Sequence, residues 1–392
     1  APAAAPSELF ALTQAVAAEL HTLYDGGTDK APPFGHFAHF HFSPATALKL
    51  SRIFGNEHAL SVTRAAAAAA EKKYLVRLRA LDFLDTDGTK LEWSELTSTV
   101  SIDKTGRKVS GVARWPALAI SGKQHHLSLR DMRFSTHHTH EIGGMTFGRT
   151  DASVADLSWN PSNTSTPIQF EDMRASTVML RRGKVADLDY RVSVKSATFD
   201  GERFDGIHLA LRMLNLDPKT MGVAGREIQS LNVAGQTQEE QVASMLLLFN
   251  RDGADAVRKG ATLVFDDWSA SYHGNKFSVK GRIGFDKAAR PGRTRDSVLE
   301  SFMKIVAHFD VRVPVALLRD FAAAVPRNVP GGEQPVSGAA AALAARDKAD
   351  ALIAKAVGDG YARLVNGELR SAIDFKGGKL SFNGKHFPLP GE

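Results

Sequence analysis

Closely spaced histidines are the residues of this sequence whose types and positions could carry chemistry. His39 and His41 lie two positions apart, and so do His138 and His140. Residues two apart on a β-strand share one face, so either pair could present two imidazoles to a metal ion. However, the sequence has no HExxH helix and no accompanying pattern of Asp and Glu. We therefore assign no metal and no cofactor, and these four histidines are where a metal would be sought first.

Other catalytic patterns are missing from the sequence. It contains no cysteine, which excludes thiol catalysis, disulfide bonds and cysteine-ligated metals. It also has no GxSxG elbow, Walker loop or GxGxxG motif after a strand, so nucleophilic and nucleotide chemistry lack their usual support. A Ser-His-Asp triad stays open as an alternative, because its members need not be close in sequence. We expect a protein that is not an enzyme and assign no catalytic residues.

Flexible apolar side chains form the second candidate site. Met and Phe adapt well to the hydrocarbon chain of a ligand. Helices expected over 242–249 and 298–306 have apolar faces, and with a curved sheet they could enclose a groove. The candidate residues are Met213, Met245, Phe249, Phe302 and Met303. We predict that they contact a lipid or another hydrophobic ligand, and the alternative is that they belong only to the core.

The charge distribution limits the partners of the chain. Its 392 residues include 49 Lys and Arg and 43 Asp and Glu, which gives a formal net charge of +6. These charges are mixed along the chain and form no basic block with interleaved aromatic residues, as a nucleic-acid binder would have. We therefore expect no nucleic-acid partner. The hydrophobic content of 43% is sufficient for a sizeable core.

A short recurring phrase shows how the scaffold is built. Residues 272–281 and 375–384 both read aromatic, basic, Gly, small, Lys, apolar, Ser, apolar, polar, Gly, and 102–111 is a degenerate third copy. The first glycine supplies the positive φ that a tight hairpin turn needs, and the alternation after it is typical of a half-buried strand. Each phrase therefore predicts a strand, a tight turn and a second strand.

Apolar residues recur with a period of two from about residue 74 to residue 213, most clearly over 188–194 and 207–213. Short, evenly spaced strands of this kind predict a largely antiparallel meander. Helices are expected over 44–54, between the cap Ser43 and Gly55, and also over 57–73, 314–325 and 339–357.

These elements together predict an α+β fold that is mostly antiparallel β, with a long curved meander-type sheet and peripheral amphipathic helices. We expect a mainly helical segment over 1–73, an antiparallel β-rich body over 74–235, and a helix, a β-hairpin and further helices over 236–325. Residues 326–338, rich in Pro and Gly, are the expected linker. A C-terminal helix and hairpin over 339–392 are expected to pack on the same sheet.

Four segments carry a resemblance to a known family. They are 106–111 leading into 115–118, then 209–217, 253–285 and 358–385. Together they resemble the YdgA-like family of bacterial envelope proteins, a family of unknown function, and they cover most of the chain from about residue 75 onward. The resemblance implies a periplasmic location in a Gram-negative bacterium, usually with an N-terminal hydrophobic anchor, and self-association. It supplies no catalytic residues.

The first residues bear on the compartment. Residues 1–6 (APAAAP) are typical of the stretch that remains after a leader peptide is removed, or of a chain cut just past an anchor. No apolar run approaches the ~20 residues that a membrane span requires. We expect a periplasmic protein, anchored to the inner membrane in its precursor or free, whose membrane association depends only on an N-terminal segment absent from this chain.

Three functions from different classes are consistent with these observations. The first is a non-enzymatic periplasmic protein that binds a lipid or another hydrophobic ligand in an apolar groove. The second is a structural or interaction protein that pairs its edge strands with an envelope partner or with another copy, forming a homodimer. The third is a histidine-dependent metal-binding protein.

Overall fold

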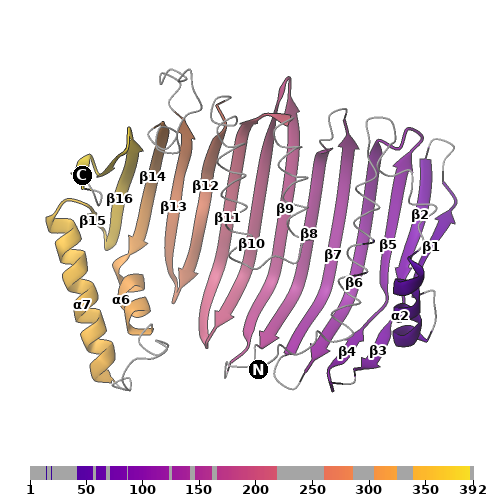
Figure 1. Cartoon of the computed structure of the whole chain (residues 1–392). Helices are drawn as coiled ribbons and strands as arrows, with labels where there is room; N and C mark the ends of the chain where they lie inside the picture. Colours follow the sequence, from indigo (N-terminus) through magenta and orange to yellow (C-terminus); the bar gives the residue numbers. More distant parts are fainter. Residues whose placement is uncertain are drawn as a thin grey trace. The chain divides into compact units, whose positions relative to one another are not determined.

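Strands dominate the computed structural model of the protein (Figure 1). The structure describes residues 15, 19, 42–55, 59–67, 71–85, 87–122, 126–141, 146–160, 166–218, 260–285, 304–324 and 339–388. The chain divides into two compact units. Unit 1 comprises Ala1–Glu202 and Asp217–Leu247, and unit 2 comprises Arg203–Leu216 and Leu248–Glu392.

Unit 1 contains an antiparallel meander. Its described elements are α2 (Pro44–Phe54), β1 (Leu60–Ala65), β2 (Glu71–Leu78), β3 (Leu81–Leu84), β4 (Lys90–Trp93), β5 (Leu96–Asp103), β6 (Lys108–Ser121), β7 (His126–His140), β8 (Thr146–Asn160), β9 (Ile168–Arg182) and β10 (Val185–Phe199). The strands pair in the order β1, β2, β5, β6, β7, β8, β9, β10. The β3–β4 hairpin pairs with the last residues of β6, beyond the first residue of β5.

Unit 2 repeats this plan with shorter strands. Its described elements are β11 (Glu202–Leu216, from its second residue), β12 (Thr262–Tyr272), β13 (Asn275–Phe285), β14 (Ile305–Pro314), α6 (Val315–Ala324), α7 (Ala339–Gly358), β15 (Arg363–Val365), β16 (Glu368–Lys376), β17 (Lys379–Phe382) and β18 (Lys385–Phe387). The strands pair in the order β11, β12, β13, β14, β16. Strands β15 and β17 pair with different parts of β16, and β18 pairs with β17. The predicted α+β, mostly antiparallel fold is confirmed.

The described helices lie at the periphery of the strands, as predicted. Helix α2 begins after Ser43, whose hydroxyl accepts a hydrogen bond from the backbone N–H of Thr46 (3.3 Å), and ends at Gly55 with φ 63°. It packs its Leu50 and Ile53 on Leu91. Helices α6 and α7 contact each other, and the ion pair Arg319–Asp350 (2.7 Å) joins them. Within the described ranges, no helix is both long and apolar enough to cross a membrane.

The recurring phrases form hairpins, as predicted. His273 and Gly274 connect β12 to β13 with φ values of 48° and 78°, and Gly377 and Gly378 connect β16 to β17 with 58° and 75°. Two consecutive positive φ values define the type I′ turn that suits the twist of paired strands. The third phrase makes a wider loop between β5 and β6, in which Gly106 has φ 69°.

The helix predicted over 57–73 is wrong for the described part of that range. Residues 60–65 form β1 and residues 71–78 form β2, which pair with each other antiparallel. The helix propensity of the alanines is weak compared with a ladder of hydrogen bonds to a neighbouring strand. Val62 on β1 is the cross-strand partner of Val76 on β2, and Tyr74 lies two residues before Val76, so these three apolar side chains share one face.

The strands of unit 1 have one apolar and one polar face. Cross-strand partners point to the same side of a sheet and successive residues to opposite sides, so the register assigns each side chain to a face. The apolar face of unit 1 carries Val76, Val100, Ile102, Val109, Ala113, Phe134, Ala152, Ala175, Leu188 and Val192. The polar face of unit 1 carries ion pairs within single strands, among them Arg149–Asp151, Arg174–Asp172 and Arg191–Asp189.

A line of unpaired residues crosses unit 1 from β6 to β10. Its members are Pro116, Asp131, Ala155, Asp172 and Lys195, each of which the cross-strand register skips. Asp131 and Asp172 have φ values of 48° and 46°. An extra residue in a strand reverses the alternation of the side chains beyond it. Because every strand from β6 to β10 has its extra residue at the same level, the pairing continues on both sides of the line.

The sequence follows this reversal, so the apolar face of unit 1 extends across the line. On β7 the apolar side chain is even-numbered before the line (Phe134) and odd-numbered beyond it (Leu129). The next row of the apolar face is Trp93, Leu118, Leu129, Leu157, Phe170 and Ala197. The rings of Trp93 and Trp115, on opposite sides of the line, lie 5.9 Å apart, which shows that both belong to one face.

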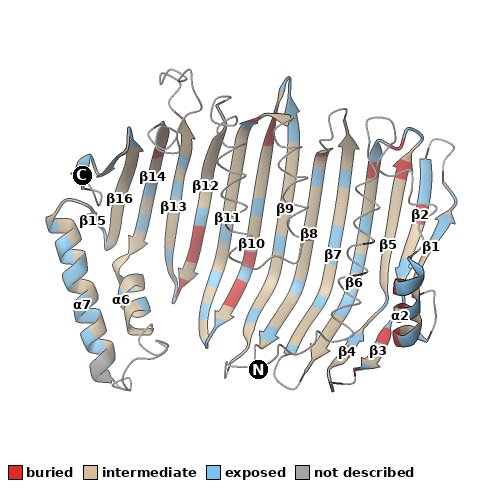
Figure 2. Cartoon of the chain, in the orientation of Figure 1, coloured by how far each residue is buried: buried red, intermediate tan, exposed pale blue. Residues whose placement is uncertain are grey.

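Unit 2 also has two chemically different faces. The apolar face of unit 2 consists of two adjacent rows: Met213, Leu263, Ile283, Ala307, Phe375 and Leu380, and Leu211, Phe265, Gly281, Phe309, Ile373 and Phe382. The polar face of unit 2 carries Arg212, Arg282, His308 and Asp374 in one cross-strand row. Ala307 is buried, whereas the other side chains of the two apolar rows are only half-buried. Figure 2 shows how few positions of the central strands are fully buried.

Candidate functional site

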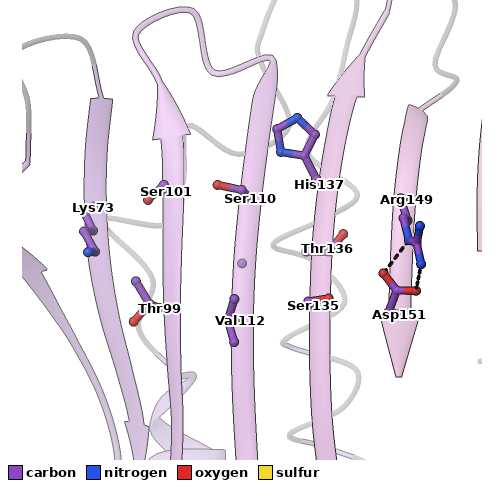
Figure 3. A pocket seen from close by; sticks show the side chains of 11 residues that line it. Lys73, Thr99, Ser101, Ser110, Val112, Ser135, Thr136, His137, Arg149 and Asp151 are labelled. Atoms are coloured by element: carbon purple, nitrogen blue, oxygen red, sulfur yellow. Dashed lines mark hydrogen bonds and ion pairs between the residues drawn. The ribbon is translucent and has the colours of Figure 1, made fainter. Parts of the chain in front are cut away.

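A shallow hollow of about 280 Å³ lies on the polar face of unit 1 (Figure 3). Lys73, Ser101, Ser110, His137 and Arg149 follow one another across β2, β5, β6, β7 and β8 in a single cross-strand row. The hollow exists because short serine side chains occupy the centre of this row, while longer side chains stand at its ends. Thr99, Val112, Ser135 and Asp151 lie in the next row of the same face.

Two opposite charges in this hollow, those of Arg149 and Asp151, compensate each other. Arg149 donates from Nε and Nη2 to both carboxylate oxygens of Asp151, at 2.7 and 2.8 Å. These hydrogen bonds lower the pKa of Asp151 and raise the pKa of Arg149. Among the described residues, no serine of the hollow is hydrogen-bonded to His137, so the hydroxyls lack the adjacent base that an activated nucleophile needs. The hollow therefore offers hydrogen bonds to a polar molecule.

A second, larger hollow of about 660 Å³ surrounds the hairpin between β5 and β6, where Asp103, Arg107, His140, Glu141 and Arg181 are among its lining residues. Partial burial acts to raise the pKa of Asp103, but hydrogen bonds from Thr105 and from the backbone N–H groups of Lys108 and Arg107 lower it overall. Asp103 thus stabilises the turn as a charged cap. This role explains its position without a ligand.

The structure places the predicted histidine pair His138 and His140 on the apolar face of unit 1. The Nε2 atom of His138 lies 2.7 Å from the hydroxyl of Thr150, and Nδ1 of His140 lies 3.5 Å from that of Thr146. Burial lowers the pKa of His138 more than the nearby backbone of Phe147 raises it. In the described part of the chain, no three His, Asp or Glu side chains are grouped to hold a metal ion. His39 and His41 lie outside the described residues.

One candidate ligand residue, Met213, lies in a row of the apolar face of unit 2. Its cross-strand partner is Leu263 on β12, which is itself the partner of Ile283 on β13. Met245, Phe249, Phe302 and Met303 lie outside the described residues, so their contacts are not defined. The structure therefore brings Met213 together with other strand residues.

His308, on the polar face of unit 2, is a titratable site that the sequence analysis missed. Its Nδ1 lies 2.8 Å from Oδ1 of Asp374 on β16, and its Nε2 lies 3.4 Å from Oδ2 of Asp310 on β14. The hydrogen bond with Asp374 raises the pKa of His308 despite a smaller opposing effect of burial. The HxD spacing of His308 and Asp310 was visible in the sequence. The contact with Asp374 was not, because Asp374 lies on β16, 66 residues further along the chain.

The apolar faces also include two exposed tryptophans that were not among the predicted ligand-binding residues. Trp159 (46% exposed) and Trp268 (47% exposed) belong to the apolar faces of units 1 and 2, respectively. The sequence did indicate the extended apolar face of unit 1, because the apolar residues of β7, β8, β9 and β10 change between even-numbered and odd-numbered positions partway along each strand. This indication was missed because only the line of unpaired residues shows that both kinds of position belong to one face.

The fold and its sites define a class of antiparallel β protein whose strands separate an apolar face from a polar, ion-paired face. A family model described as "Bacterial protein of unknown function (DUF945)" matches residues 39–390. The chain belongs to this bacterial family. No curated protein and no solved structure matches the chain.

Proposed function

We propose that this protein is a non-enzymatic binding protein of the bacterial envelope whose apolar strand faces hold the hydrocarbon part of a lipid or another hydrophobic molecule. The observation that carries the proposal is the pair of apolar rows around Met213 and Phe309 in unit 2. The twelve positions of these rows come from six different strands, yet all except Ala307 keep part of their surface exposed. A face that served only as core would be expected to contain more fully buried side chains.

Hydrocarbon binding is energetically reasonable on such a face. Each methylene group removed from water contributes ~0.8 kcal/mol, so about ten methylenes would contribute ~8 kcal/mol before the entropic cost of binding. Met213 and the aromatic side chains Phe265 and Phe309 offer a surface that can adapt to a flexible chain. The polar faces, with their paired Arg and Asp side chains, would stay in water.

An exported, periplasmic location is part of the proposal. The absence of cysteine suits an oxidising compartment, in which a free thiol would be reactive. Cell fractionation of a Gram-negative host that expresses the full-length gene should recover the protein in the periplasmic or envelope fraction. Recovery only from the cytosol would contradict this part of the proposal.

Binding can be tested with the fluorescent apolar probe N-phenyl-1-naphthylamine and two matched pairs of variants. Met213→Gln and Phe134→Gln place an amide on the apolar faces of units 2 and 1. Leu214→Gln, next to Met213 on β11, places the same amide on the polar face of unit 2. Val112→Gln, on β6 beside the β7 strand of Phe134, places it on the polar face of unit 1. The first two variants should weaken probe binding about 3- to 10-fold, and the second two less than 2-fold.

Native mass spectrometry provides an independent measurement. Protein purified from a bacterial host should carry co-purifying lipid in a fraction that Met213→Gln reduces and Leu214→Gln does not. If the wild-type protein binds neither the probe nor any lipid, the proposed function is wrong. If all four variants weaken binding equally, the apolar faces are not the binding surface.

A further inference from the structure

Three polar side chains joined by hydrogen bonds lie on the apolar face of unit 1, and we call them the island. The Nε2 atom of His138 and the hydroxyl of Thr136 lie 2.7 and 3.3 Å, respectively, from the hydroxyl of Thr150. In the register, Thr136 is the partner of Thr150, and Thr150 is the partner of Thr177 on β9. A polar group on an apolar surface costs free energy unless it is hydrogen-bonded. The donors and acceptors of such a cluster therefore need partners, either within the cluster or from another molecule.

Apolar residues flank the island in the row of His138, whereas Thr177 continues the row of Thr150 and His140 lies one row further along β7. Ile102 and Val109 lie beside His138 in its cross-strand row, and Met179 and Leu188 lie on its other side. One row further along the strands, Phe134 leads toward the extended apolar rows. A chain-like molecule anchored at Thr136 can therefore place its hydrocarbon part along β7 and β8.

Two glycines leave the island open to a ligand. Gly111 is the cross-strand partner of Thr136, and Gly148 is the partner of His138. Neither position contributes a side chain to the face, so Thr136 and His138 each lack one lateral neighbour. A Cβ atom added to Gly111 would meet Cγ2 of Thr136 at 3.4 Å, so even a methyl group would begin to cover this threonine.

The chemistry of the island favours an uncharged hydrogen-bonding group. Burial lowers the pKa of His138, which favours the uncharged imidazole, and threonine hydroxyls both donate and accept hydrogen bonds. Arg181, on the same face toward this end, forms an ion pair with Glu141. An anionic group at the island would be partly desolvated, and the three residues of the island include no Lys or Arg to balance its charge.

We infer that the His138–Thr150–Thr136 island binds the hydroxyl or ester head group of an uncharged, single-chain amphiphile whose hydrocarbon part lies along the apolar face of unit 1. The inference rests on the proposed function, because it assigns the polar end of a ligand whose apolar end that function requires. Thr136 is the direct contact for the ligand. Thr150 holds His138 and Thr136 in position through its hydroxyl.

Competition experiments with three probes of equal chain length test this inference. Monolaurin carries hydroxyl and ester groups, dodecyl sulfate carries an anion, and dodecane carries no head group. Each should displace N-phenyl-1-naphthylamine from the wild-type protein, with monolaurin the tightest. The variant Thr150→Val removes one hydroxyl at constant shape, and Thr139→Val is the matched control on the polar face.

Thr150→Val should weaken monolaurin about 3- to 10-fold, the usual range for a lost hydrogen bond, and change dodecane less than 2-fold. Thr139→Val should change neither. An equal loss for monolaurin and dodecane, no loss for either, or a preference for dodecyl sulfate would overturn the inference and leave the proposed function intact. Failure of the wild-type protein to bind N-phenyl-1-naphthylamine would overturn both.

Discussion

The ring of Phe309 on β14 occupies the space directly over Gly281 on β13. A Cβ atom added to Gly281 would lie 2.4 Å from Cδ1 of Phe309 and 2.4 Å from the backbone oxygen of His308. The ring of Phe309 also contacts that of Phe265 on β12, with centroids 5.4 Å apart. A glycine covered by an aromatic ring from the next strand is thus part of the apolar face of unit 2.

Gly281→Ala should therefore destabilise the protein by about 1–3 kcal/mol, because the new methyl group meets both a ring and a backbone oxygen. Urea unfolding followed by circular dichroism would measure the loss. Gly284→Ala, on the same strand, is the matched control: its nearest contact would be 3.5 Å from Thr262, so its stability should stay within about 0.5 kcal/mol of wild type. Equal effects of the two substitutions would contradict the packing described for Phe309.

Gly148→Ala should have a larger effect in unit 1. Gly148 has φ 144°, and a Cβ atom there would lie only 1.9 Å from the backbone oxygen of His137. The strand would have to move, at a cost of at least about 3 kcal/mol, and the contact of His138 with Thr150 would be disturbed. Gly111→Ala, whose closest contact would be 3.4 Å, serves as the control. Thermal unfolding that ranks the two variants in the opposite order would refute this geometry.

His308 should make stability depend on pH in a defined direction. Its pKa is raised above the ordinary value by Asp374, with Asp310 on its own strand and Arg282 on β13 also facing it. A raised folded pKa means that the imidazolium contributes stability fully below the unfolded pKa of about 6.5. That contribution is lost as the pH rises through the folded pKa.

The destabilisation caused by His308→Gln should accordingly be larger at pH 5.5 than at pH 8.5. Urea unfolding at both pH values measures it, and NMR titration of the imidazole gives the pKa directly. Asp374→Asn should bring the titration of His308 back toward that of an unstructured histidine. A titration of His308 below the ordinary range would show that burial outweighs its carboxylate partners.

Asn383 should be a sensitive position in the C-terminal hairpin. Its Oδ1 accepts a hydrogen bond from the backbone of Ala372 (3.0 Å), and its Nδ2 donates to the backbone oxygen of Tyr361 (3.0 Å). It also adopts φ 50° in the turn between β17 and β18. Asn383→Ala should cost about 2–4 kcal/mol, and Asn383→Asp, which keeps only the acceptor, should cost less. Equal stability of Asn383→Ala and wild type in urea would contradict these contacts.

Local signals predicted much of this fold from the sequence. Ser43 and Gly55 mark the ends of α2 because a cap and a left-handed terminator act within a few residues. The paired turn residues His273 and Gly274 specify their hairpin for the same reason. The alanine-rich helix α7 also follows from local propensity.

Features that depend on distant partners were not predictable in this way. Residues 60–65 form a strand because β2 pairs with them, which their own propensity does not reveal. The apolar residues change from even to odd positions between Val76 and Leu81 because β2 ends at Leu78 and a new strand, β3, begins at Leu81. The spacing of His138 and His140 correctly predicted that they share a face. The contact of His138 with Thr150 was not predictable, because it depends on the register between β7 and β8.

Tryptophan fluorescence offers the most direct test of hydrocarbon binding, because Trp159 and Trp268 lie partly exposed on the apolar faces of the two units. Variants that keep only one of these tryptophans would be titrated with monoacylglycerol carrying a dibrominated acyl chain, and with the unbrominated chain as control. A matched variant would carry its only tryptophan at Val112→Trp, on the polar face. We predict saturable quenching of Trp159 and Trp268 by the brominated chain alone, and none at position 112. Equal quenching on both faces, or no saturable quenching of either natural tryptophan, would contradict the account.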